Sequence, residues 1–262
     1  MSEPPIFHLT RGQIPLLVSF PHSGTFIPSD IAARMTDVAR ILPDTDWHVP
    51  RLYAFLEALG ASRIEATHSR YVVDLNRPPD DQELYAGQKK TGLVPIDSFK
   101  GEPLYREGEA PGTDEIIARR KYWQPYHDAL AQELSRLKAV HGSVILWDAH
   151  SIESVLPELF EGRLPDLNLG TFDGKSCDAD IADAVFAAGK ASSFSAVLNA
   201  RFKGGYITRH YGNPGRGVHA IQLEMAQSIY MDEGPPFTYR PDRATKVTAA
   251  IRAMIAAALK EM

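Results

Sequence analysis

The chain alternates short apolar runs with amphipathic segments over nearly its whole length. Continuous apolar runs are typical of strands buried on both faces, and apolar positions repeating every three or four residues are typical of helices. Runs of the first kind predict strands at residues 16–20, 62–66, 71–75, 143–147, 167–172, 195–198 and 218–223. The second pattern predicts helices at residues 31–41, 46–59, 114–140, 179–188 and 242–259.

Several helix boundaries are marked by particular residue types. In residues 46–59 the apolar side chains fall on one face, and Gly60 is a suitable stop. Thr113 is a candidate N-cap for the long helix at residues 114–140, inside which Pro125 predicts a kink. These signals favour well-separated helices between the strands.

The regular alternation of strands and helices indicates the α/β class. We expect a single domain over residues 1–262, with a mixed, mostly parallel sheet and helices on both faces. Residues 76–112 are rich in proline and glycine but retain apolar residues, which predicts a long ordered loop. Ligands of such sheets bind beyond the carboxyl ends of the strands, so chemistry is expected there.

Composition narrows the possible partners. The 262 residues are 44% hydrophobic and 23% charged, with a net charge of −5, so there is no basic field for nucleic acid. Cys177 is the only cysteine, which excludes an internal disulfide. The residues after Met1 lack the basic and apolar stretches of a signal peptide, and no apolar run is long enough for a membrane span, so we expect a cytoplasmic protein without a signal peptide.

Two histidines follow predicted strands. His22 lies just after residues 16–20, and His150 lies just after residues 143–147. Neutral imidazole is a common metal ligand, and a catalytic zinc ion takes three protein ligands and one water molecule. The third ligand is sought among Asp44, Asp46 and His48, with Asp46 preferred because it opens a helix.

Two carboxylates near these positions have expected roles. Asp148 lies two residues before His150 and is a candidate partner for the second ring nitrogen of that histidine. Glu224 ends the apolar run at residues 218–223. Beside a metal-bound water, its carboxylate would have a raised pKa and serve as general base.

Polar residues elsewhere suit an acidic ligand. Asn76 and Arg77 follow residues 71–75, and a guanidinium group matches a carboxylate in shape and charge. Arg70 precedes the same run. Residues 204–214 combine glycines with aromatic, Arg and His side chains, which is typical of a loop that approaches a ligand closely.

A family resemblance rests on five segments taken in order. They are Pro21-His22-Ser23-Gly24, Asp44-Thr45-Asp46, residues 69–77 (SRYVVDLNR), Asp148-Ala149-His150-Ser151 and Gln222-Leu223-Glu224-Met225. With them the chain resembles the N-formylglutamate amidohydrolase (deformylase) family of bacterial histidine breakdown, from Leu16 to about Asp232. The family is distantly similar to zinc carboxypeptidases, which use His-x-x-Glu where this chain has Thr25.

The resemblance implies zinc-dependent hydrolysis of N-formyl-L-glutamate to formate and L-glutamate, on one zinc ion. It implies that Glu224 is the general base and that Arg70 stabilises the oxyanion. The residues expected to bind the two carboxylates of this small substrate are Asn76, Arg77 and one of Arg209 or Arg216, with Tyr206 in the glycine-rich loop.

Three alternatives stay open at this point. The acyl group could be acetyl or succinyl, and the metal could be another divalent ion. An arginase-like formimidoylglutamase shares Asp148-Ala149-His150, but Ile152 replaces the second Asp of its motif. A metal-free dicarboxylate-binding protein would use the arginines without the histidines.

Overall fold

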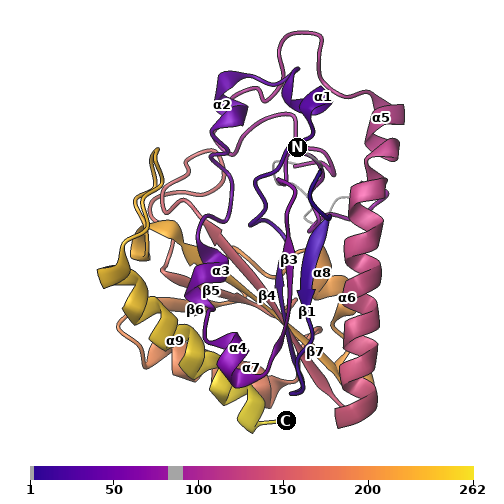
Figure 1. The fold of residues 1–262 in the computed structure, drawn as a ribbon. Coiled ribbons are helices and arrows are strands. Elements are labelled where there is room, and N and C mark those ends of the chain that lie inside the picture. The colour runs from indigo at the N-terminus through magenta and orange to yellow at the C-terminus, as the bar shows by residue number, and fades with distance from the viewer. Residues whose placement is uncertain (1–2, 82–90) are drawn as a thin grey trace.

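The computed structural model describes residues 3–81 and 91–262, which form a sheet covered by helices (Figure 1). The strands are β1 (Phe7–Thr10), β2 (Leu16–Phe20), β3 (Ser62–Ala66), β4 (Val144–Ile152), β5 (Leu167–Gly170), β6 (Ala196–Leu198) and β7 (Val218–Ala226). They form one seven-stranded sheet in the order β1-β3-β2-β4-β7-β5-β6. The central strands β4 and β7 pair over nine positions, the longest pairing in the sheet.

The helices lie on both faces of this sheet, with α6 along one face and α7 and α9 along the other (Figure 1). The helices are α1 (Ser29–Ala32), α2 (Asp37–Arg40), α3 (Val49–Leu52), α4 (Leu56–Leu59), α5 (Thr113–Ala118), α6 (Arg120–His141), α7 (Ala179–Lys190), α8 (Tyr206–Tyr211) and α9 (Pro241–Lys260). Two short 3-10 helices are η1 (Pro214–Arg216) and η2 (Gln227–Ile229).

The sheet is mixed and mostly parallel, as the sequence predicts. Strands β3, β2, β4 and β7 run parallel to one another, and β5 runs parallel to β6. The exceptions are β1, antiparallel to β3, and β5, antiparallel to β7. The predicted α/β class is therefore confirmed, and β2, β4 and β7 direct their carboxyl ends to the same edge of the sheet.

Alternate residues of the central strands belong to two separate cores. In β2, Val18 packs with the core under α7 and α9, while Leu17 packs with the core under α6. In β4, Trp147 packs with the core under α7 and α9, and Leu146 packs with the core under α6. Successive side chains of a strand point to opposite faces, so a strand covered on both faces is apolar throughout.

Some predicted elements are wrong. Residues 71–75 form turns and not a strand, with a hydrogen bond from the Val72 amide to the Ser69 carbonyl (2.8 Å). The run is apolar because it is buried in the core under α6, and burial alone does not require pairing. Residues 46–59 form two single-turn helices, α3 and α4. Strand β1, at the sheet edge, was not predicted because it is only four residues long.

The other long elements differ in detail. The predicted helix at residues 114–140 is divided at Arg119 into α5 and α6. Pro125 lies in the second turn of α6, near its start. Of the predicted loop at residues 76–112, residues 82–90 lie outside the described residues. Leu93 and Leu104, on its described part, are buried in the core under α6.

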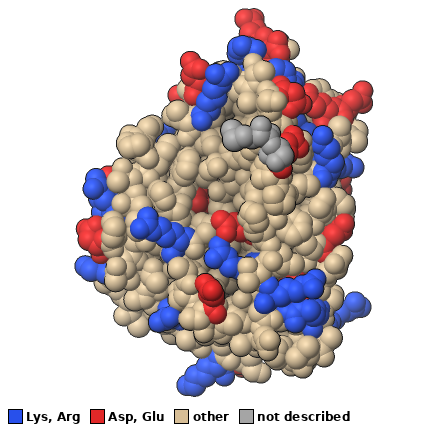
Figure 2. Space-filling view, viewed as in Figure 1, with Lys and Arg blue, Asp and Glu red and all other residues tan. Residues whose placement is uncertain are grey.

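None of the described helices combines the length and the apolar composition that crossing a membrane requires. On the face shown in Figure 2, basic and acidic side chains are interspersed. That distribution is consistent with the small net charge of the chain, −5.

Candidate metal and substrate site

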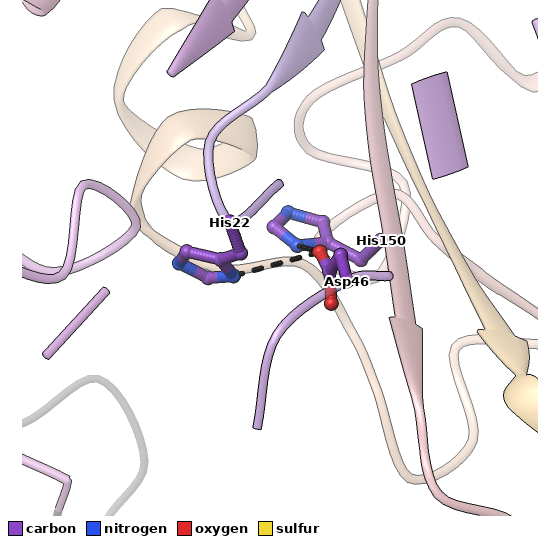
Figure 3. A group of neighbouring side chains, drawn as sticks. All are labelled: His22, Asp46 and His150. Atoms are coloured by element: carbon purple, nitrogen blue, oxygen red, sulfur yellow. Dashed lines mark hydrogen bonds and ion pairs between the residues drawn. The ribbon is translucent and has the colours of Figure 1, made fainter. Parts of the chain in front are cut away.

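Three chain segments bring two histidines and a carboxylate together. His22 follows β2, and His150 lies near the carboxyl end of β4, the parallel neighbour of β2. Asp46 reaches them because its backbone amide donates to the His22 carbonyl, at 3.0 Å. Figure 3 shows the carboxylate of Asp46 between the two imidazole rings. At Gly24 a Cβ atom would lie 2.2 Å from the His68 carbonyl oxygen, so only glycine permits the turn after His22.

The spacing of the three side chains fits a small metal ion. Oδ2 of Asp46 lies 3.2 Å from Nδ1 of His150 and 3.8 Å from Nδ1 of His22. The potential ligand atoms all lie within 4.8 Å of one another, and all three residues are buried. Zinc bonds of about 2.0–2.1 Å in tetrahedral geometry separate the ligand atoms by about 3.4 Å. The group could therefore hold such an ion after small movements.

A second carboxylate holds the far nitrogen of each imidazole. Nε2 of His22 lies 2.7 Å from Oδ1 of Asp74, and Nε2 of His150 lies 2.9 Å from Oδ2 of Asp148. A carboxylate on Nε2 fixes the hydrogen there and leaves the lone pair on Nδ1. Both rings thus present Nδ1 to the same point, next to Asp46.

The electrostatics differ between the two histidines. Burial and the neighbouring Arg70 guanidinium lower the pKa of His22, which favours its neutral form. Burial opposes the charge on His150, but the Asp148 and Asp46 carboxylates outweigh it and raise its pKa. When His150 is protonated, its positive charge pairs with the Asp46 carboxylate. A metal cation between the two rings would pair with Asp46 in place of that proton.

Glu224 lies opposite His150 in the β4–β7 register and is buried. Its Oε2 accepts a hydrogen bond from Nε2 of Gln222 (3.1 Å), whose Oε1 accepts from the Gly205 amide (2.7 Å). Burial raises the pKa of Glu224 to about 8, and the Asp46 carboxylate acts in the same direction. Gln222 therefore orients the carboxyl group that the sequence analysis selected as general base.

These groups line one cavity of about 100 Å³. A cavity of about 10–15 Å³, measured in the same way, holds one water molecule. The cavity therefore has room for a small ligand. Polar and charged residues of its wall are His22, Asp46, Arg70, Asn76, Arg77, Thr91, His150, Ser151, Arg201, Gln222 and Glu224. Phe99, Ile152, Leu159, Phe202 and Gly205 complete it.

Arginines on the cavity wall differ in their partners. Arg70 is buried and donates from Nη2 to Oδ2 of Asp74 at 2.6 Å, and its Nη1 lies 3.5 Å from Nδ1 of His22. Arg77 donates from Nε to the carbonyl and hydroxyl of Thr91, at 2.9 and 3.1 Å. The charge of Arg70 is thus matched inside the protein, whereas these bonds of Arg77 go to neutral oxygens.

Asn76 lines the cavity, but the protein itself uses its amide group. Nδ2 lies 3.2 Å from Oδ2 of Asp148, and Oδ1 accepts from the Ile207 amide at 2.8 Å. A Cβ atom at Gly205 would lie 2.4 Å from the Asn76 side chain, so the loop before α8 packs directly against it. Through these hydrogen bonds Asn76 connects α8 to β4.

Three predicted substrate-binding residues are not on the cavity wall. Arg209 donates from Nε to the Gly204 carbonyl (2.8 Å), and Tyr206 stacks on His210 with 4.8 Å between ring centroids. Arg216 is exposed in η1, just before β7 begins. It therefore lies at the opposite end of β7 from Glu224.

The two competing metal ligands also lie apart from the group. Asp44 accepts a hydrogen bond from the Phe99 amide at 2.9 Å, and His48 lies 2.7 Å from the Phe237 carbonyl. Among the described residues, Asp46 is the carboxylate that groups with both histidines.

Sequence reasoning assigned no role to Asp74, Gln222 and Arg201, nor to Thr91 and Ser151 on the cavity wall. Asp74 and Gln222 lie two residues before Asn76 and Glu224, and the same spacing led to Asp148 from His150. Arg201 comes three residues after β6 ends. Because β6 runs parallel to β5 and β5 runs antiparallel to β7, the carboxyl end of β6 points away from the edge where β2, β4 and β7 end. The rule about carboxyl ends therefore gave no signal for Arg201.

An α/β sheet that carries buried imidazoles and carboxylates in a polar cavity at its carboxyl edge is typical of an enzyme, and its His22, Asp46 and His150 group could hold a metal ion. The family model for N-formylglutamate amidohydrolase matches residues 14–231. The chain belongs to the N-formylglutamate amidohydrolase family. The resemblance seen in the sequence is thereby confirmed.

Two curated relatives and two solved structures extend this result. N-formylglutamate deformylase of Pseudomonas aeruginosa is 54% identical, over 95% of this chain and 94% of the relative. The enzyme of that name from Pseudomonas putida is 50% identical, over 97% and 94%. An N-formylglutamate amidohydrolase from Ralstonia eutropha superposes with a TM-score of 0.83 at 25% identity, over 96% of both chains. A gene product of Agrobacterium tumefaciens (TM-score 0.74, 17% identity, 98% and 96% covered) shares the fold.

Proposed function

We propose that the chain hydrolyses the formamide bond of N-formyl-L-glutamate, giving formate and L-glutamate, as a step of histidine breakdown. The observation that carries this proposal is the buried His22, Asp46 and His150 group beside Glu224 in one cavity. Substrate identity is supported by relatives that bear the deformylase name over nearly the full chain.

The ligand set proposed for the metal is Nδ1 of His22, Nδ1 of His150 and a carboxylate oxygen of Asp46. Two imidazoles and one carboxylate are a common donor set for catalytic zinc, and they leave a position for water. When bound, zinc supplies a Lewis acid that polarises a carbonyl group and lowers the pKa of water. Asp74 and Asp148 orient the two histidine ligands, because each carboxylate contacts the Nε2 atom of one ring.

Glu224 moves the proton in this scheme. Its carboxylate lines the cavity and Gln222 fixes its direction. It takes a proton from the attacking water and delivers it to the nitrogen of the leaving L-glutamate. Arg70, held by Asp74, presents a fixed positive charge where the formyl oxygen becomes negative.

Arg77 binds a substrate carboxylate. Its hydrogen bonds to Thr91 fix the guanidinium group, and the partners in those bonds carry no charge. A carboxylate at this position makes charge-assisted hydrogen bonds. The remaining carboxylate of the substrate needs a further cation.

Elemental analysis combined with a formate-release assay tests the proposal. The purified protein is expected to contain one zinc ion per chain and to release formate from N-formyl-L-glutamate. N-acetyl- and N-succinyl-L-glutamate and formiminoglutamate serve as comparison substrates. Faster hydrolysis of one of these would replace the proposed substrate, and full activity in a metal-free protein would exclude the zinc mechanism.

A further inference from the structure

Arg201 lies on the cavity wall with the histidines and Glu224, on a segment that follows β6. Its Nε and Nη2 donate to the carbonyl oxygen of Leu159, at 3.1 and 3.0 Å. The Cζ atom lies 5.4 Å from the ring centroid of Phe202. These contacts set the position of a half-buried guanidinium group at the cavity.

The wall around Arg201 is apolar. Leu159 and Phe202 flank it, and Ile152 extends this surface. The three belong to a small core cluster that is separate from the two cores beside the sheet. An apolar surface that ends at a fixed cation complements a short methylene chain that ends in a carboxylate.

Arg77 occupies a different position relative to the reacting atoms. It follows Asn76, whose amide contacts Asp148 behind His150. In an N-formyl amino acid, the Cα atom that bears the α-carboxylate is bonded to the nitrogen of the bond to be cleaved. The α-carboxylate must therefore lie close to the metal ligands, and the Arg77 guanidinium interacts electrostatically with Asp74, the carboxylate that holds Nε2 of His22.

Arg70, the other arginine on the wall, already carries the Asp74 carboxylate at 2.6 Å. We propose that Arg201 binds the carboxylate at the end of the substrate side chain and so selects acidic side chains. This assignment rests on the proposed function. It makes Arg201 the residue that distinguishes glutamate from a neutral amino acid of the same length.

Two substrates and two variants test the assignment. N-formyl-L-glutamine matches N-formyl-L-glutamate in shape but has a neutral side-chain end. For Arg201→Met we expect kcat/KM on the glutamate substrate to fall about 10- to 100-fold, the range for losing a charge-assisted hydrogen bond. On the glutamine substrate we expect a change within about twofold. Arg77→Met should instead lower kcat/KM on both substrates, because both carry the α-carboxylate.

The control variant is Arg252→Met, which removes an exposed arginine of α9 outside the cavity wall. It is expected to keep wild-type kinetics on both substrates. Melting temperatures are measured for every protein. If Arg201→Met melts well below wild type, Arg201→Lys replaces it, with a smaller loss expected on the glutamate substrate alone.

Equal losses on both substrates, in a variant that melts like wild type, would overturn the assignment. An unchanged preference for the glutamate substrate would also overturn it. If the wild-type protein hydrolyses neither substrate, the proposed function has failed. Calorimetric binding of L-glutamate and L-glutamine to the same proteins then still shows whether Arg201 recognises the side-chain carboxylate.

Discussion

Replacement of Asp148 by Asn separates the charge of this residue from its shape. Oδ2 of Asp148 accepts from Nδ2 of Asn76 at 3.2 Å and lies 2.9 Å from Nε2 of His150. Oδ1 is buried and has no hydrogen-bond partner among the described residues. The amide oxygen of Asn can therefore take the place of Oδ2. Its NH₂ group takes the place of Oδ1, so one buried polar group without a partner is exchanged for another and no hydrogen bond is lost.

The expected effect of Asp148→Asn is weaker zinc binding in a folded protein. Loss of a carboxylate behind a ligating histidine costs about 10- to 100-fold in metal affinity. The low end applies here because the acceptor atom is retained, so we expect about tenfold, or about 1.4 kcal/mol. Zinc affinity is measured by competition with a chromophoric chelator, and the melting temperature of the metal-free protein should stay close to wild type.

Asp148→Ala provides the contrast, because it removes the acceptor as well. Nε2 of His150 and Nδ2 of Asn76 would both be left inside the protein without Asp148. Nδ2 of Asn76 lies 3.0 Å from Nε2 of His150 and can donate to it, so the loss corresponds to one unpaired buried donor, about 1–3 kcal/mol. At about 2–4 °C per kcal/mol, the melting temperature should fall clearly. Zinc affinity of Asp148→Asn equal to wild type would refute the supporting role of this carboxylate.

Three further predictions test the remaining roles in the site. His150→Ala should lose zinc and activity together in elemental analysis and the formate assay, whereas Asp44→Ala should keep its zinc because Asp44 lies outside the ligand group. A zinc-replete, active His150→Ala protein would disprove the ligand assignment. Glu224→Gln should keep zinc and lower kcat by about 10²–10⁴-fold with little change in KM; near-normal turnover would place the base elsewhere. Arg77→Ala should lower kcat/KM about tenfold or more, mainly through KM and with an unchanged melting temperature, and a wild-type KM would remove its role in substrate binding.

The central sheet was predictable because its strands are covered on both faces. Continuous apolar runs identified β2, β4 and β7, and their order along the chain indicated parallel pairing. The carboxyl-end rule then led from those strands to His22, His150 and Glu224, which the structure brings to one cavity. Those residues could be found because each lies at or beyond the end of its own apolar run.

Residues that depend on loop geometry were less predictable. Residues 71–75 are as apolar as a strand, yet they form turns. A short buried segment has the same apolar sequence pattern whether or not it pairs as a strand. Arg209 lies in the glycine-rich segment of residues 204–214, and Arg216 lies two residues after that segment. The composition of a segment does not show where its side chains point. In the structure Arg201 lies on the cavity wall, whereas Arg209 and Arg216 do not.

Asn76 lies in the site, as the sequence predicts, but its contacts indicate a different role from the predicted one. The sequence put Asn76 beside Arg77 and suggested that both bind substrate. In the structure the Asn76 amide joins Asp148 to the first turn of α8, so its hydrogen-bonding groups are engaged before any ligand arrives. It follows that Asn76→Ala should impair zinc binding and stability together with catalysis, whereas Arg77→Ala should impair substrate binding alone. A change in KM only, for both variants, would instead support the paired role that the sequence suggested.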